Sequence, residues 1–432
     1  MAEEITAISS NNMSIIGHDD LGKYGDCGEG IQIHVGKNGR RTLFIAHLNA
    51  PGDFSAVDVT DPRHPRVIYT QELVNPKGRS NSLMIVGDMM AVARQVPPGE
   101  KPAGVEIFDI ADPTKPRSIG FWDASGPESP GTHYVWWVDG EYIYAASGTP
   151  DWDPHTANMG WQTVILDVRD PTRPREAGRW HLPGTSKSDG FRVKSHAEEV
   201  AEALGVPLPP GPIRGAVKVG DIMTWNAQNR VHDVYCYPER PDRCYVAYLD
   251  SGAIILDVSD KAHPKMVSQF DYHIPQPGYT HTAMPLFSKG LLAITEEGSA
   301  DPQAADQPKT LRFADISFEQ RPQLVSAISL PNKEELAGKE RYGAHNVYQN
   351  VPGEGSFRSE DVIVGTFFSL GVRAYDLSDP WRPELQAYCI PPAPRGREVT
   401  QMNDLHIDER GIVYATERSA NGLFIMEWDR ET

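Results

Sequence analysis

The chain has few cysteines and no long apolar run. Only four cysteines occur in 432 residues, and no two form a Cys-x-x-Cys pair of the metal-binding kind, which excludes a disulfide framework. No segment approaches the roughly 18 continuous apolar residues of a membrane-spanning helix. The first residues, MAEEITAISSNNMS, also lack the apolar stretch of a signal peptide. We therefore expect a soluble, cytoplasmic protein without a membrane partner.

Positive charge is also scarce. Asp and Glu number 59 against 41 Lys and Arg, which gives a formal net charge of -18. A surplus of this sign repels phosphate backbones and anionic lipid. We expect no nucleic-acid partner.

The sequence does contain one phrase that is repeated six times. Each copy is a β-branched or aromatic run of strand length that ends on an acidic residue and continues into a polar, proline-containing turn. An Asp side chain bonds nearby backbone amides and proline presets the turn dihedral, so both have mechanical roles there. The copies are FSAVDVTDPRHP (from Phe54), VEIFDIADPTKP (Val105), TVILDVRDPTRP (Thr163), AIILDVSDKAHP (Ala253), LRFADISFEQRP (Leu311) and VRAYDLSDPWRP (Val372), with the shorter GLFIMEWD (Gly422) as a seventh.

The repeat predicts the architecture. Each copy follows two strands joined by a tight polar turn and precedes another short strand, so one unit has four strands. Successive marker acids, from Asp58 to Glu427, lie 51 to 61 residues apart except for one interval of 90, which an insertion at about 185–230 lengthens. This pattern predicts an all-β, seven-bladed β-propeller spanning 1–432 as a single domain. Two β-sandwiches are the alternative, but they do not predict one turn phrase per unit.

The amino-terminal stretch MSIIGHDD predicts how the ring closes. The last unit supplies only three strands, whereas this stretch has the pattern of an unassigned strand. Pairing Ser14–Gly17 with the last blade would remove the exposed edges of a ring left open.

The runs AIILDVSD, VEIFDIAD and TVILDVRD, each followed by a proline-containing turn, resemble the LVIVD-repeat proteins. The resemblance covers most of the chain, from about Ile31 to Asp429. It implies a propeller and names no reaction, so the chemistry has to come from the site.

Four consecutive units begin with histidine at the start of the first strand. The stretches are GTHYVWW, RVHDVYC, YTHTAMP and GAHNVYQ, which hold His133, His232, His281 and His345. The other three units have Ile31, Asn81 and the stretch 403–406 at this place. First strands lie innermost in a blade, so we expect these four imidazoles to converge at one mouth of the axial channel.

Converging imidazoles predict a metal site. Imidazole suits iron, copper, zinc and nickel, and a histidine-held metal is a catalytic centre when one coordination position stays open. We expect a divalent transition metal, with Fe(II) favoured and Cu, Zn or Mn as alternatives. A ring of structural histidines that bond carbonyls of the next blade is the competing interpretation.

The arrangement is similar to that of the carotenoid-cleavage oxygenases, seven-bladed propellers that hold Fe(II) on the axis with four histidines from different blades. The similarity is in arrangement alone. It implies a metal-dependent, oxygenase-like oxidoreductase, and we expect a small organic molecule as its substrate.

Further residues near the predicted mouth are candidates for catalysis. Tyr279 and Tyr342 precede His281 and His345, and could place a phenol beside a substrate or pack the rim. Glu296 follows a second strand and Asp404 lies in the last unit, where an acid could support a metal-bound imidazole.

The insertion at 185–230 contains SHAEEVAEALG, which has the capping-box pattern of Ser195 and Glu198 and a stop at Gly205. A helix there could act as a lid over the mouth or as an oligomer contact, and the oligomeric state is open. Two functional alternatives also stay open: a zinc- or manganese-dependent lyase or hydrolase at the same site, and a non-catalytic propeller that binds a protein on one face.

Overall fold

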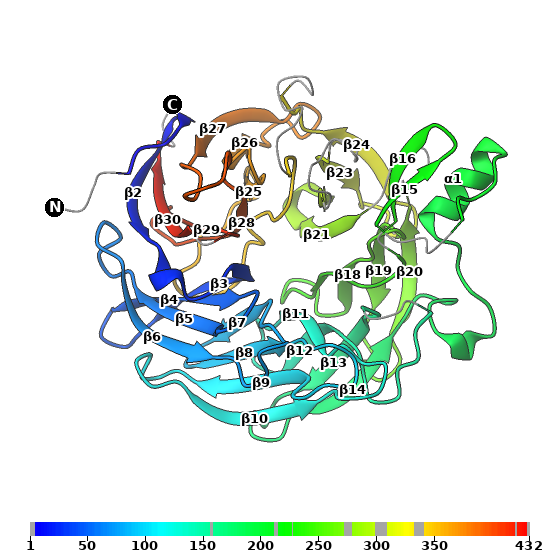
Figure 1. Ribbon diagram of the computed structural model, residues 1–432, viewed down its shortest axis with the longest axis horizontal. Coiled ribbons are helices and arrows are strands. Elements are labelled where there is room, and N and C mark those ends of the chain that lie inside the picture. Colours follow the sequence, from blue (N-terminus) through cyan, green and yellow to red (C-terminus); the bar gives the residue numbers. More distant parts are fainter. Residues whose placement is uncertain are drawn as a thin grey trace.

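Figure 1 shows the computed structural model of the chain, in which β-sheets are arranged radially around a central axis. The structure describes residues 5–155, 159–210, 215–226, 228–271, 279–298, 309–331, 341–419 and 421–429. Over these residues the strands include seven four-stranded antiparallel sheets, which confirms the predicted seven-bladed β-propeller.

Blades one to five each consist of four strands in chain order, with the first strand nearest the axis (Figure 1). Blade one is β3 (Cys27–Val35), β4 (Arg41–His47), β5 (Gly52–Asp58) and β6 (Arg66–Glu72). Blade two is β7 (Leu83–Val86), β8 (Met89–Arg94), β9 (Gly104–Asp109) and β10 (Arg117–Asp123). Blade three is β11 (Thr132–Trp136), β12 (Tyr142–Ser147), β13 (Gln162–Asp167) and β14 (Arg175–Trp180). Blade four is β17 (Val234–Tyr235), β18 (Arg243–Ala247), β19 (Ala253–Asp257) and β20 (Lys265–Phe270), and blade five is β21 (Thr280–Leu286), β22 (Leu291–Glu296), β23 (Leu311–Asp315) and β24 (Gln323–Ala327).

Blades six and seven each take a strand from the amino-terminal segment. Blade seven is β28 (Met402–Ile407), β29 (Val413–Glu417), β30 (Gly422–Trp428) and β2 (Met13–Asp19). Ser14 pairs with Glu427 and Gly17 with Ile425, so the predicted closure is confirmed. Blade six is β25 (Val362–Thr366), β26 (Val372–Asp376) and β27 (Glu384–Ile390), with β1 (Ser9–Asn11) added at its outer edge. Its axial position is held by the segment 345–348, where Val347 bridges to Gly365.

Apolar side chains of the repeated runs fill the spaces between blades. In β19 of blade four, Ile254 and Leu256 are buried in the large cluster that includes blade three, while Ile255 is buried against Ala283 and Ile294 of blade five. This alternation follows from the period of two in a strand, which sends successive side chains to opposite faces. The four cysteines are buried and free, which agrees with the absence of a disulfide framework.

The repeated turns have the bonding that their residues predict. In six blades the Asp at the end of the third strand accepts a hydrogen bond from the backbone N–H two residues later, with donor-acceptor distances of 2.7 to 3.2 Å. In five blades the second Asp of the phrase does the same at 3.0 or 3.1 Å. These side chains fix the connection between the third and fourth strands.

Each of several turns also packs on the outer strand of the preceding blade. A Cβ atom added at Gly120 of β10 would lie 2.0 Å from the carbonyl oxygen of Pro171 in the turn of blade three, and one at Gly178 of β14 would lie 1.9 Å from that of Lys261 in blade four. Gly17 of β2 has the same relation to Pro62 in blade one, at 2.1 Å. The phrase therefore joins neighbouring blades as well as strands.

The insertion contains the helix α1 (His196–Leu204) and the hairpin β15 (Gly215–Val219) and β16 (Ile222–Asn226). Ser195 and Glu198 form the expected capping box and Gly205 ends the helix in the left-handed conformation. Helix and hairpin lie at the outer side of the ring and away from the axis (Figure 1). Single-turn 3-10 helices occur at Leu21–Lys23, Lys187–Asp189 and Phe287–Lys289. Among the described residues, every helix is too short or too polar to traverse a lipid bilayer.

Candidate metal centre

One residue at the start of each innermost segment takes part in a ring around the axis. Around the ring, Asn81 donates to Glu29 at 3.1 Å and its Nδ2 lies 3.5 Å from Nε2 of His133. Neighbouring imidazole rings then follow with centroid distances of 4.5, 3.9 and 4.4 Å, and the last histidine bonds the backbone oxygen of Asn403. The ring consists of Glu29, Asn81, His133, His232, His281, His345 and Asn403, and all seven are buried.

The backbone is irregular where the ring residues lie. Strand pairing skips His133 between Thr132 and Tyr134, His281 between Thr280 and Thr282, and Asn403 between Met402 and Asp404. In blade one the skip extends from Cys27 to Ile31 and includes Glu29. A β-bulge re-aims a side chain that regular pairing would direct elsewhere. The repeated bulge accounts for why equivalent residues of different blades meet.

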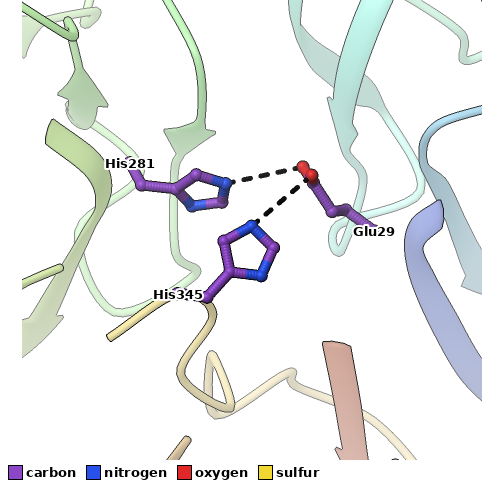
Figure 2. A group of neighbouring side chains, drawn as sticks. All are labelled: Glu29, His281 and His345. Atoms are coloured by element: carbon purple, nitrogen blue, oxygen red, sulfur yellow. Dashed lines mark ion pairs between the residues drawn. The ribbon is translucent and has the colours of Figure 1, made fainter. Parts of the chain in front are cut away.

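Four imidazole Nε2 atoms converge near the carboxylate of Glu29. Nε2 of His281 lies 3.6 Å from Oε2 and Nε2 of His345 lies 3.6 Å from Oε1, as Figure 2 shows. On the other side, Nε2 of His232 is 4.0 Å from Oε2, and the Nε2 atoms of His133 and His232 are 3.0 Å apart. The structure thus brings all four sequence-predicted histidines together.

Each histidine has an oxygen within hydrogen-bond distance of its second nitrogen. Nδ1 of His133 lies 2.9 Å from Oε1 of Gln95, and Nδ1 of His232 lies 2.8 Å from Oδ1 of Asp233. Nδ1 of His281 lies 3.2 Å from Oγ1 of Thr282, and Nδ1 of His345 lies 2.7 Å from the backbone oxygen of Asn403. An acceptor at Nδ1 favours a proton there and turns Nε2 toward the axis, where it can bind a metal in place of any second proton, which is the usual arrangement around metal-binding histidines.

Glu29 is the main residue that sequence reasoning missed. Counting along the repeat aligns Ile31 with the histidines, but the extended bulge in β3 puts Glu29, two residues earlier, into the ring. Gly28 and Gly30 flank it because a Cβ atom at either place would lie 2.7 Å from Asn81 O or 2.3 Å from Leu83 N of blade two. The signal in the sequence was the acid enclosed by glycines, GEG, at the beginning of the first strand.

The ionisation of the ring reflects burial and mutual contact. Burial lowers the pKa of His133 and His232 well below the ordinary histidine value, with a further reduction from a neighbouring imidazole in each case. Burial would raise the pKa of Glu29, but contact with His281 and His345 holds it well below its usual range. For His281, burial acts to lower the pKa, yet the carboxylates of Asp233 and Glu29 raise it to about 9.

The donor set fits a divalent transition metal. Two nitrogens bound at right angles at about 2.1 Å from one ion would be about 3.0 Å apart, which is the separation of the His133 and His232 Nε2 atoms. Within the described part of the chain, the buried Nε2 atoms of His281 and His345 have no hydrogen-bond partner. Ligand atoms in the groups Glu29–His281–His345 and Glu29–His133–His232 lie within 4.8 Å of one another. Buried, unpaired lone pairs of this kind are costly without a ligand.

The acids named from the sequence lie at different distances from the ring. Glu296 ends β22, and its carboxylate accepts a hydrogen bond from Arg312 at 3.2 Å. The next residue, Glu297, instead reaches the ring, with Oε1 3.7 Å from Nε2 of His345. Asp404 is buried beside Asn403 and accepts from the backbone N–H of Leu405. Burial raises its pKa well above the usual carboxyl value, and Glu29 adds to this effect.

The two tyrosines also differ in position. Tyr279 is half-buried, and its ring centroid lies 6.2 Å from that of His232. It has a φ of 107°, a conformation that is strained for a bulky side chain and is found most often at functional sites. Tyr342 is 3% exposed and packs within the apolar core, with a backbone bridge to Phe368. The structure places Tyr279 in ring contact with His232.

Comparison with known proteins supports the fold. The model of the LVIVD repeat matches residues 243–272, which include β18, β19 and β20. No curated protein sequence matches the chain. Similar solved structures include the β-propeller domain of Cps50 (Swd1) from Myceliophteria thermophila, with a TM-score of 0.55, 10% identity and coverage of 98% of this chain and 100% of that chain.

Two further propellers have similar scores. The WD40 propeller domain of Doa1 has a TM-score of 0.51 and 11% identity, and the alignment covers 99% of this chain and 98% of that chain. Sqt1 from Chaetomium thermophilum, solved with the N-terminus of a ribosomal protein bound to it, has a TM-score of 0.52, 10% identity and coverage of 99% and 100%. At this level of identity the likeness concerns the fold alone.

Proposed function

We propose that the protein is a metal-dependent enzyme whose centre lies on the propeller axis and whose ligands are His133, His232, His281, His345 and Glu29. The observation that carries the proposal is the orientation of the imidazoles. The Nε2 atoms of three of them lie within 4.0 Å of the Glu29 carboxylate, and that of His133 lies 3.0 Å from that of His232. All four Nδ1 atoms have an oxygen neighbour. A purely structural ring would not need buried Nε2 atoms of several histidines turned toward one carboxylate.

The donor set supports iron as the first choice of metal. Four imidazoles and one carboxylate suit Fe(II), while copper, zinc and manganese accept similar donors. His133, His232, His281, His345 and Glu29 would hold such an ion. When bound, such an ion would supply redox or Lewis-acid chemistry. We propose oxidative chemistry on a small organic substrate, the reaction class that the resemblance noted from the sequence implies, with Glu29 added to the four predicted histidines as a ligand.

The chain's own residues have definite tasks in this proposal. Asp233 holds the ring of His232 through Nδ1, and its other oxygen accepts from the hydroxyl groups of Tyr235 and Thr282. Gln95 holds His133 in the same way. Tyr279 lies beside His232 and is itself partly exposed, so we propose that its phenol contacts the substrate. The ring itself is closed to solvent, since its residues are between 0% and 7% exposed.

Metal analysis tests the proposal directly. We expect purified protein, or protein reconstituted under anaerobic conditions with Fe(II), to hold about one ion per chain by plasma mass spectrometry. His281→Ala and Glu29→Gln should lose most of this metal. The matched control is His406→Gln, because His406 is also a buried histidine on an innermost strand but bonds Gly355 outside the ring. Wild-type protein that holds far less than one ion after exposure to iron, copper, zinc and manganese would refute the proposal.

The same measurement separates the alternatives. Zinc or manganese as the native metal would favour a lyase or hydrolase at this site. A stable, metal-free protein that tolerates loss of the histidines would favour a protein-binding propeller. The structure of Sqt1 with a bound peptide shows that a similar fold can serve that purpose.

A further inference from the structure

The ring positions without histidine are consecutive around the axis. The histidines come from blades three to six, and the remaining arc consists of Asn403 of blade seven, Glu29 of blade one and Asn81 of blade two. Glu29 therefore has an asparagine on each side. Both asparagines direct the amide nitrogen at blade one, and this nitrogen only donates hydrogen bonds and offers no lone pair to a metal. Their task at the centre is therefore different from that of a ligand.

Asn81 is bonded to Glu29 through its side chain and through its backbone. Its Nδ2 donates to Oε2 of Glu29 at 3.1 Å, and its backbone oxygen accepts from the backbone N–H of Glu29 at 2.6 Å. The same Nδ2 lies 3.5 Å from Nε2 of His133. Asn81 is 0% exposed and Glu29 is 7% exposed. Asn81 thus holds both the carboxylate and the backbone that carries it.

Asn403 holds the residues that precede Glu29 in the same bulge. Its Nδ2 donates to the backbone oxygens of Cys27 and Gly28 at 3.1 and 2.7 Å. Its Oδ1 accepts from Nη1 of Arg418 at 2.8 Å, so both ends of the amide are paired. Strand pairing in blade one skips this stretch, and a bulge leaves backbone groups without their regular strand partners. The two asparagines therefore fix the bulge from blade seven and from blade two.

Gln32 joins the same two blades outside the ring and offers a comparison. It lies on β3, three residues after Glu29, and is buried. Its Nε2 donates to the backbone oxygen of Ile85 at 3.2 Å and its Oε1 accepts from the backbone N–H of Ile85 at 2.7 Å, so the whole amide is paired. Asn81 instead bonds a carboxylate, and its buried Oδ1 has no hydrogen-bond partner among the described residues. An unpaired buried acceptor is costly, so joining the blades does not by itself account for Asn81.

We infer that Asn81 and Asn403 are positioning residues that present the Glu29 carboxylate to the ion: Asn81 orients the carboxylate, and Asn403 holds the bulge from which it projects. The inference rests on the proposed function, because it takes Glu29 as a ligand. The two carboxylate oxygens lie 3.6 Å from Nε2 of His281 and from Nε2 of His345. A carboxylate free to rotate would lose this arrangement, and ligands that are not held in place bind a metal less tightly.

A double-mutant cycle on metal affinity tests the inference. Affinities of the full chain for Fe(II) under anaerobic conditions, and for Zn²⁺ in parallel, are measured against chelators of graded strength for the wild type, Asn81→Ala, Glu29→Gln and the double variant. Asn81→Ala alone should lower affinity by about 10–100-fold, the usual effect of losing a group that orients a ligand. In the Glu29→Gln background the same change should cost no more than about twofold. A residue that acts through blade stability would cost the same in both backgrounds.

Gln32→Ala is the matched control, because it removes a buried amide between the same two blades. Its metal affinity should equal that of the wild type, whereas Asn403→Ala should show a loss of the same order as Asn81→Ala, and circular dichroism should show that the variants are folded. The inference is overturned if either asparagine variant binds metal as the wild type does, if Gln32→Ala loses as much affinity, or if the loss from Asn81→Ala is unchanged in the Glu29→Gln background. Each of these results keeps the proposed metal centre, whereas a wild-type chain that holds no metal would refute both.

Discussion

Equivalent positions of the repeat form two regions: the turns between third and fourth strands, and the ring on the axis. The residue type is kept at the turns and changes at the axis. At the turns, the same residue recurs with the same bond: six Asp side chains accept the N–H two residues later. On the axis, the residue changes from Glu to Asn to His while the backbone bulge recurs. An Asp that recurs in the turn of each blade serves the fold. A residue that differs from blade to blade at the axis belongs to a site that several blades build together.

The largest expected difference between the two regions is in metal binding. The double variant His133→Ala/His345→Ala should lower metal affinity by at least about 1000-fold, because binding energies of about 10 kcal/mol or more are distributed over a few ligands. The double variant Asp109→Ala/Asp376→Ala, which changes two turns, should bind metal as the wild type does. Competition with a chelator of known affinity measures both. Equal affinities in the two variants would contradict the division of roles.

A buried histidine outside the ring sharpens the comparison. Burial lowers the pKa of His406 to about 4, so the folded protein keeps it neutral while the unfolded chain binds a proton below about pH 6.5. Stability should therefore decrease as the pH falls from about 6.5 to 4, and this group contributes up to about 3 kcal/mol of the loss. His406→Gln should reduce the pH dependence by that amount in denaturant titrations at pH 7 and pH 4.

Two aspartates compare ring and turn within one blade. Asp233 orients His232, and its replacement by Asn should lower metal affinity by about 10–100-fold, as loss of a group that supports a ligand usually does. Asp257, at the turn of the same blade, bonds Ser259, and Asp257→Asn should have no effect on affinity. The measurement is again chelator competition. A comparable loss from both variants would show that the effect passes through blade stability.

The smallest expected effect is at a single turn. Asp376 accepts from the backbone N–H and the hydroxyl of Ser378, and Asp376→Ala should lower the free energy of unfolding by about 1 kcal/mol, the net value of a typical hydrogen bond. Urea denaturation measures it. Asp379→Ala, which removes the next Asx bond in the same turn, should have a similar cost. A loss several times larger would mean that the turn holds the neighbouring blade as well.

The sequence predicted the architecture and the four histidines because both depend on position within a repeat. The phrase ending on Asp58, Asp109 or Asp376 set the phase of each unit, and that phase placed the histidines on neighbouring innermost strands. Glu29 escaped prediction because its bulge skips more positions than the others, so counting from the strand gave Ile31. Asp233 and Gln95 escaped because they act through Nδ1 of a ring histidine, a relation that appears only once the rings are oriented.

The neighbouring acids show the same limit on a smaller scale. Glu296 is the last residue of the second strand β22, and Glu297 is the next residue in the chain. Side chains of successive strand residues point to opposite sides, so one carboxylate meets Arg312 and the other His345. An alignment of repeats that is uncertain by one residue cannot tell them apart.

The two amino-terminal strands complete the last two blades of the propeller. β2 is synthesised near the start of the chain, yet its partner β30 is near the end, and β1 likewise waits for β27. Until then the last two blades lack their outermost strands, and their exposed edges can pair with other chains. Aggregation through exposed strand edges is therefore most favoured at this last step of folding. We expect fewer aggregates when a binding partner covers the segment of β1 and β2 until the last two blades have formed.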